Sequence, residues 1–133
     1  MNTQTSTINT PLALFARVLI GALFFIAGVR KLFAFAGTAG YFGSLGFPLP
    51  EVVTALVILL EIVGPILFVL GWRLRALSIV MAIYTLLTAL IAHRFWSADA
   101  AAFSGQLNNF FKNVSICGAF LYVAAVTPFT RKN

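Results

Sequence analysis

Four long apolar runs, separated by short polar stretches, dominate the hydrophobic and polar pattern of this chain. A helix needs about 20 mostly apolar residues to cross a hydrocarbon core of about 30 Å. On this criterion we predict membrane-spanning helices over about residues 11–36, 51–70, 74–95 and 110–126. The predicted fold is therefore all-α, a four-helix transmembrane bundle that forms one domain over residues 11–128.

The two ends of the chain are polar and lie outside these runs. Residues 1–10 carry no charged side chain, so we predict a flexible tail that ends at Pro11, a residue well suited to a first helical turn. At the other end, residues 129–133 include Arg131 and Lys132 and are predicted to form a basic C-terminal tail.

The two longer loops contain turn and cap residues that predict short interfacial helices. Gly37 is expected to break the first helix, and Thr38 then to cap a short helical turn. A second short capped helix at the surface is expected over Ser97, Ala98, Asp99 and the following alanines, and Asn108 and Asn109 would end it.

Composition agrees with a membrane environment. The apolar set makes up 61% of the 133 residues and charged residues only 9%, against about 25% in soluble domains. Lipid must therefore cover a surface that this chain cannot cover with ions. The net charge of +6 is spread over single or paired basic residues at the ends of apolar runs, which favours contact with the lipid bilayer and excludes a nucleic-acid partner.

An even number of spans places both termini on one side of the membrane. Basic residues are slightly more numerous on that side, so the positive-inside rule weakly favours cytoplasmic termini.

Ionisable side chains inside a span are costly and normally face a partner, a cavity or a ligand. Arg17 in the first span and Glu61 in the second are expected at similar depths, and we predict a structural intramembrane ion pair between them. A role for Glu61 in proton handling or ligand binding is the alternative.

Small residues predict where the helices pack. On the first helix Gly21 and Gly28 share a face with Arg17, Phe24 and Lys31, so a neighbouring helix or a flat ligand can approach closely there. Similar stripes are predicted on the third helix, with Ser78, Ala82, Thr85, Ala89 and Ala92, and on the fourth, with Ser115, Ala119 and Tyr122.

Several donors and an aromatic side chain belong to the ends of spans on one side of the membrane: Lys31, His93, Trp96, Asn109, Lys112 and Asn113. With Glu61, they suggest a pocket for a planar carbonyl compound or an anionic headgroup. The alternatives are an interfacial His93 bonded to a loop carbonyl and a Lys112 that snorkels to the interface.

The chain has one His, one Cys and three acidic residues. It cannot by itself supply two haem histidines, a tetrahedral zinc site or an iron–sulfur cluster, so we predict no metal site and no intrinsic cofactor. Electrons in any redox role would enter through a partner subunit or a lipid-phase carrier. The pattern assigns no catalytic residue.

The order and spacing of these residues resemble the DoxX family of bacterial membrane proteins, in particular its YqjF-like branch. The resemblance covers about residues 12–126. It rests on the following positions: Arg17, Gly21, Gly28, Lys31, Ala36-Gly37-Thr38, Tyr41, Gly46, Pro48, Leu59-Leu60-Glu61, Gly64, Gly71, Arg75, Thr88-Ala89, His93, Lys112-Asn113 and Gly118. Two positions depart from the family pattern. Arg30 replaces a small or apolar residue, and Pro65 replaces a common glycine.

The resemblance implies a multi-pass protein of the bacterial inner membrane, and a subunit of a quinone-linked oxidoreductase system such as thiosulfate:quinone oxidoreductase. On this reading His93 and Lys112 hydrogen-bond a quinone and Glu61 handles protons. The alternative is a noncatalytic scaffold or assembly factor that tethers a soluble or membrane redox partner. A solute carrier is a weaker third option that would require a homo-oligomer.

Overall fold

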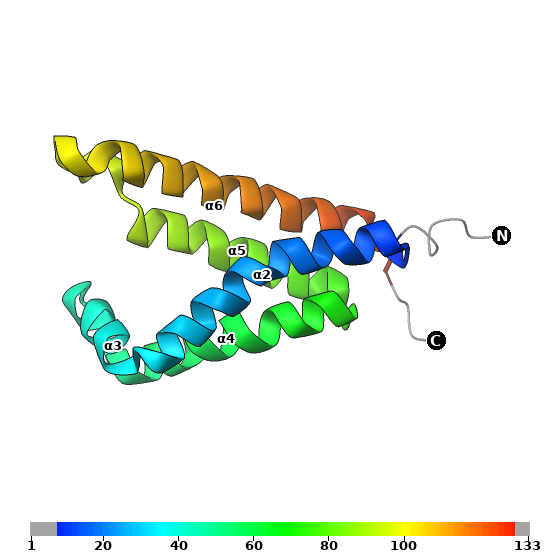
Figure 1. The fold of residues 1–133 in the computed structure, drawn as a ribbon, viewed down its shortest axis with the longest axis horizontal. Coiled ribbons are helices and arrows are strands. Elements are labelled where there is room, and N and C mark those ends of the chain that lie inside the picture. Colours follow the sequence, from blue (N-terminus) through cyan, green and yellow to red (C-terminus); the bar gives the residue numbers. More distant parts are fainter. Residues whose placement is uncertain (1–7, 130–133) are drawn as a thin grey trace. The chain divides into compact units, whose positions relative to one another are not determined.

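The computed structural model describes residues 8–129, and every regular element in this part is helical. In chain order the elements are α2 (Pro11–Phe33), α3 (Phe35–Ser44), α4 (Pro50–Leu70), α5 (Leu74–Ala92), the 3₁₀ turn η1 (Phe95–Ser97) and α6 (Ala100–Val126). They form two compact units that divide between Trp72 and Arg73. In each unit two long helices run in opposite directions, α2 with α4 and α5 with α6 (Figure 1).

Four helices in the described part are long and apolar enough to cross a membrane. They correspond to the four predicted runs, so the all-α fold class with four spans is confirmed. The predicted tails fall largely outside the described residues: 1–7 of the N-terminal tail and 130–133 of the C-terminal tail.

Helix α2 begins where the sequence predicts. Thr10 is its N-cap, and the Thr10 Oγ1 accepts a hydrogen bond of 3.2 Å from the Ala13 amide. Pro11 occupies the first helical position, where its missing N–H costs nothing.

The first span ends earlier than predicted. The backbone leaves the helical conformation at Ala34, whose N–H is shared between the Arg30 and Lys31 carbonyls. Gly37 therefore lies inside α3 and does not break the helix. Thr38 does not cap α3 either, because its hydroxyl donates back to the Ala34 carbonyl at 3.0 Å. A glycine ends a helix mainly by adopting positive φ, and in this unit Gly46 and Gly71 do so instead.

Helix α4 begins at Pro50 and ends at Gly71, which adopts the left-handed conformation as the C-cap. Pro65 lies inside this helix and is buried. Helix α3 folds back from the end of α2 and packs on α4, with Gly43 next to Pro50 at the start of α4. The first turns of α4 therefore face α3, and α2 meets α4 further along.

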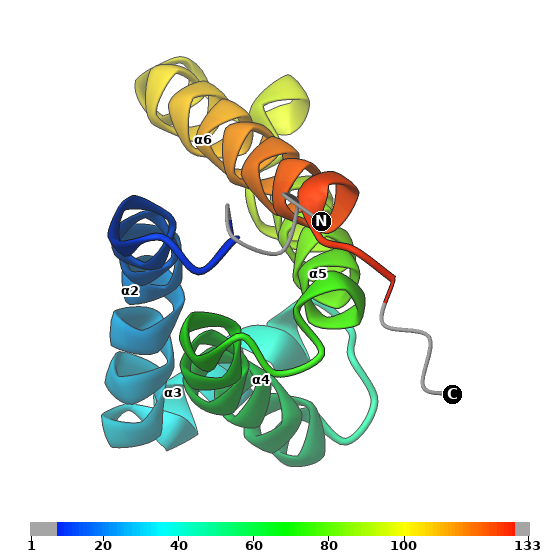
Figure 2. The same ribbon diagram turned by 90° about the vertical axis from the view of Figure 1, so that its right-hand side faces the viewer.

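The second unit differs from the prediction in the length of its last helix. Asp99 caps α6 near the predicted helix start, since its Oδ1 accepts from the Ala102 amide at 2.8 Å. However, Asn108 and Asn109 do not end a separate surface helix, because α6 continues through them for 27 residues. Asparagine costs a helix interior at most about 0.7 kcal/mol, too little to break a helix that packs along α5. The second interfacial helix is therefore the first part of α6, which is one continuous helix (Figure 2), and η1 is the short element of this loop.

The buried faces follow the predicted stripes on two helices. Arg17, Gly21, Phe24 and Gly28 are buried on α2, and Ser78, Ala82, Thr85 and Ala89 are buried on α5. The stripe predicted for α6 is wrong. Ser115 and Tyr122 are exposed, while α6 buries Cys117, Phe120 and Ala124.

Candidate functional site

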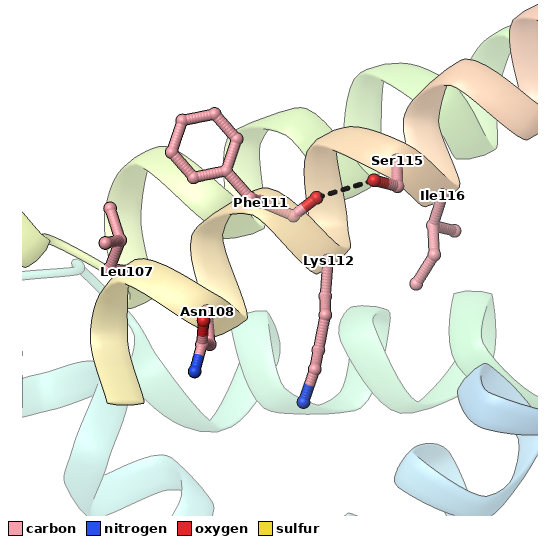
Figure 3. Close-up of a pocket in the computed structure, with 6 residues that line it drawn as sticks. All are labelled: Leu107, Asn108, Phe111, Lys112, Ser115 and Ile116. Atoms are coloured by element: carbon pink, nitrogen blue, oxygen red, sulfur yellow. Dashed lines mark hydrogen bonds between the residues drawn. The ribbon is translucent and has the colours of Figure 1, made fainter. Parts of the chain in front are cut away.

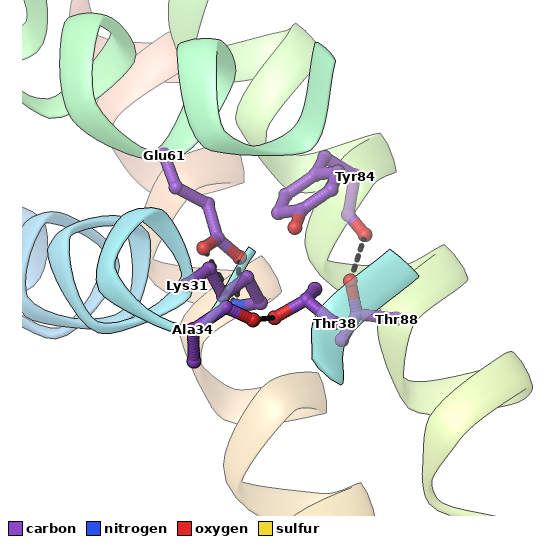
Figure 4. Close-up of polar contacts among 6 residues, drawn as sticks. All are labelled: Lys31, Ala34, Thr38, Glu61, Tyr84 and Thr88. Atoms are coloured by element: carbon purple, nitrogen blue, oxygen red, sulfur yellow. Dashed lines mark hydrogen bonds and ion pairs between the residues drawn. The ribbon is translucent and has the colours of Figure 1, made fainter. Parts of the chain in front are cut away.

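The central polar feature of the first unit is an ion pair between α2 and α4. The Lys31 Nζ lies 2.9 Å from Glu61 Oε1 and 2.7 Å from Oε2, so one ammonium holds both carboxylate oxygens (Figure 4). The Glu61 side chain is 5% exposed and the Lys31 side chain 29% exposed. Loss of the ion-pair partner would therefore cost more for the buried Glu61 carboxylate than for the Lys31 ammonium.

Gly28 allows the two helices to come this close. A Cβ atom at Gly28 would lie 2.8 Å from Ile62 Cγ1 and 2.9 Å from Glu61 Cβ, so any larger residue would push α4 away. Seven residues earlier, Gly21 packs on Pro65 at a looser 3.3 Å. The glycine face predicted on the first helix thus packs against another helix, which is the first of its two predicted uses.

Glu61 was predicted to pair with Arg17, and the structure gives it Lys31 as a basic partner. The ion pair between Arg17 and Glu61 stays a prediction. Gly28 of α2 lies next to Glu61 of α4. Arg17 lies three turns before Gly28, about 16 Å along the axis of α2.

In the second unit His93 is held at the junction between α5 and η1. His93 is the C-cap of α5, and its Nδ1 lies 3.0 Å from Oε1 of Gln106 on α6. The Gln106 amide oxygen can only accept, so Nδ1 carries the proton of this bond. The partner of His93 is therefore a side chain of α6, not the loop carbonyl of the alternative interpretation.

Aromatic rings gather around η1 at the same end of the unit. Phe95 lies at the centre, with ring centroids 5.2 Å from Trp96, 6.1 Å from Phe103, 5.2 Å from Phe110 and 6.2 Å from Phe111. Most of these pairs are edge-to-face, a favourable geometry for aromatic rings. Trp96 belongs to this aromatic cluster and remains 55% exposed.

Lys112 lines a shallow hollow of about 590 Å³ on α6 (Figure 3). The other lining residues are Leu107, Asn108, Phe111, Ser115 and Ile116. Phe111 belongs to both the hollow and the aromatic cluster, so the two features are continuous. The Ser115 hydroxyl donates to the Phe111 carbonyl at 2.9 Å, which leaves the Lys112 ammonium and the Asn108 amide as the donors available to a ligand.

The structure groups the predicted site residues into two sets. Lys31 and Glu61 are bound to each other in the first unit. His93, Trp96 and Lys112 belong to the second unit, near one end of α6. Asn113 is half-buried and does not line the hollow. A single pocket that combines both sets stays a prediction.

Gln106 and the phenylalanines of the aromatic cluster were not among the predicted site residues. A signal for Gln106 exists, because Gln106, Phe110, Asn113, Cys117 and Phe120 follow helical spacing on α6. This pattern is lost if a helix is assumed to stop at Asn108 and Asn109. Within residues 8–129, no three metal-ligating side chains of His, Cys, Asp or Glu gather at one place.

Together, four apolar spans and a buried interhelical ion pair define a polytopic helical membrane protein. The family model of DoxX matches residues 12–94. The chain therefore belongs to the DoxX family, as the sequence predicts. The match includes Lys31, Glu61 and His93, and it ends before the aromatic cluster and α6.

Relatives support the same assignment. The chain is 40% identical to "Inner membrane protein YphA" of Escherichia coli (strain K12), over 88% of this chain and 84% of the relative. It is 36% identical to "Inner membrane protein YqjF" of the same organism, over 86% and 83%. It is 33% identical to "Putative oxidoreductase CatD" of Bacillus subtilis (strain 168), over 59% and 56%. No solved structure matches the chain. The protein is thus a multi-pass inner-membrane protein.

Proposed function

We propose that this protein is a membrane subunit of a quinone-linked oxidoreductase system, and that it binds a quinone or a similar planar lipid-phase ligand at the Lys112 hollow. The main support is the arrangement of Lys112, Asn108 and Phe111 around one hollow on a membrane-spanning helix. The relative named as an oxidoreductase supports the redox part of the proposal.

The lining of the hollow fits the chemistry of a quinone. A quinone head presents carbonyl oxygens on a flat ring, and its tail is apolar. Lys112 and Asn108 supply donors for the oxygens, Phe111 supplies an aromatic surface, and Leu107 and Ile116 suit the apolar part. When bound, such a carrier supplies reversible uptake of electrons and protons.

The roles of the protein groups follow from their contacts. The Lys112 ammonium would orient a carbonyl oxygen and stabilise negative charge on it. His93 does not line the hollow, and it would contact a ligand through Nε2, the ring nitrogen that Gln106 does not hold.

Glu61 and Lys31 are the groups proposed for proton handling. Their hydrogen bond of 2.7 Å between Nζ and Oε2 provides a direct path for a proton between the two side chains. The partly exposed Lys31 Nζ is the end of this pair through which a proton would enter or leave.

The test is to extract the native protein in mild detergent and to measure bound quinone by mass spectrometry. We expect quinone in the native sample, and Lys112→Ala should lower it at least about ten-fold, the equivalent of 1.4 kcal/mol. Arg94→Ala is the matched control, because Arg94 is an exposed basic residue that does not line the hollow.

Absence of quinone from the native protein would contradict the proposal. If a partner protein then copurified, and its activity survived His93→Ala and Lys112→Ala, the scaffold alternative would replace it.

A further inference from the structure

A second hollow, separate from the Lys112 hollow, lies in the first unit. It has a volume of about 290 Å³ and is lined by apolar side chains from the end of α2, the start of α3 and one face of α4. The lining residues are Leu32, Phe35, Ala55, Ile58, Leu59, Ile62 and Val63. We call this feature the α4 groove.

The α4 groove is open to the surroundings and follows α4 over the middle part of that helix. Leu32, Leu59 and Val63 are each at least 40% exposed. On α4 the lining extends from Ala55 to Val63, about 12 Å at 1.5 Å per residue, and this stretch lies in the middle of a membrane-spanning helix. At this depth the surroundings are hydrocarbon, so lipid acyl chains are the molecules that meet the groove.

A carboxylate marks the outer end of the groove. Glu51 is exposed in the first turn of α4 and precedes Ala55 by four residues, which places both on the same helix face. Among the described residues Glu51 forms no ion pair, since the salt bridge of this unit joins Lys31 to Glu61. An acyl chain in the groove would thus bring its headgroup to the level of Glu51.

The charge of Glu51 selects among headgroups. A carboxylate repels an anionic headgroup, and it can only accept hydrogen bonds. A primary ammonium donates charge-assisted hydrogen bonds to a carboxylate, whereas a quaternary ammonium has no N–H to donate. The complementary headgroup is therefore a zwitterionic one that ends in a primary amine.

We propose that the α4 groove is a binding site for one acyl chain of an aminophospholipid, whose primary amine is held by Glu51. The site uses no residue of the Lys112 hollow, so it does not depend on the function proposed above. Ala55 gives the groove its depth beside Glu51, because it is the one lining residue with a methyl side chain.

The test uses the full chain in bilayers that contain trace spin-labelled phospholipids with identical acyl chains. The headgroups compared are ethanolamine, choline and glycerol, and the readout is the motionally restricted fraction in electron paramagnetic resonance spectra. We expect ethanolamine to be enriched over choline about two- to five-fold, the range of an exposed ion pair, with glycerol lowest. Glu51→Gln should remove this preference and leave the total restricted fraction unchanged.

A second variant tests the groove itself. Ala55→Phe should fill the groove and lower the restricted ethanolamine fraction. Ala76→Phe is the matched control, because Ala76 is an exposed alanine in the first turn of another span, α5. Circular dichroism of both variants checks that the helices are retained.

Three results would each overturn the proposal. Native protein could restrict ethanolamine and choline lipids equally, or Ala55→Phe could behave as Ala76→Phe does. Alternatively, a cysteine at Leu59 could cross-link two copies of the chain, which would show that a second protein covers the groove. Lys112→Ala should not change any of these lipid readouts, so failure here is distinguishable from failure of the quinone proposal.

Discussion

The two helical pairs of this protein are held together in different ways. In the first unit α2 and α4 meet at glycines and share a buried ion pair in the interior of α4. In the second unit, side-chain ties lie at both ends of the helix pair. Gln106 holds His93 at one end, and at the other Arg75 donates to the Thr127 carbonyl and lies 3.6 Å from the Phe129 ring centroid.

This difference reflects the solvent. Lipid tails are as apolar as leucine, so burial of apolar side chains does little to hold two helices together inside a membrane. Close backbone approach and polar pairs must therefore hold the helices together. A charge in the interior of a span also requires a partner. The first unit therefore depends on a few specific atoms in the interior of its helices, and the second has polar ties at its helix ends.

The largest expected effect is the loss of the cation in the first unit. Lys31→Met removes the ammonium from a carboxylate that is 5% exposed, and we expect a loss of about 3–5 kcal/mol in the free energy of unfolding. Denaturation in mixed micelles, followed by circular dichroism, measures it. Lys112→Met is the control, because Lys112 is exposed and forms no ion pair within residues 8–129. Equal losses in both variants would show that the ion pair does not stabilise the first unit.

The next largest expected effect on the free energy of unfolding concerns the glycine contact between α2 and α4. Gly28→Ala places a methyl group 2.8 Å from Ile62 Cγ1 and should cost about 1–3 kcal/mol, because α2 and α4 must separate. Gly118→Ala is the matched change in α6, where nothing lies within 4 Å of the added Cβ. It should be neutral or stabilise by up to about 1 kcal/mol through helix propensity. The same denaturation experiment compares them, and a tolerated Gly28→Ala would contradict the close helix contact.

The smallest effect concerns an end of the second unit. Gln106→Ala should destabilise by about 0.5–1.5 kcal/mol, the value of one hydrogen bond. A double-mutant cycle with His93→Ala should give a coupling energy of the same size, and the two single losses should not add. Asn109→Ala, at an exposed position of the same helix, is the control and should change little. Zero coupling would mean that the bond between His93 and Gln106 contributes nothing to the tie between α5 and α6.

Sequence reasoning succeeded where the signal is local. The four spans, the start of α2 at Pro11, the capped helix start near Asp99 and the glycine face of α2 each depend on a few neighbouring residues. It failed at Gly37 and at Asn108–Asn109, because these residues only permit a break in a helix and do not force one. For the candidate site, it chose Glu61, Lys31 and His93 as notable, but it did not find that Lys31 binds Glu61 or that Gln106 binds His93.

The sequence by itself determined which segments enter the membrane and which family the chain belongs to, since hydropathy and motif order are properties of the linear chain. Only the tertiary structure decided the partner of Glu61, because that choice depends on the register between α2 and α4. In this register Gly21 and Gly28 contact residues of α4 that lie more than thirty positions away in the chain. Such distant contacts leave no periodic signal in either helix.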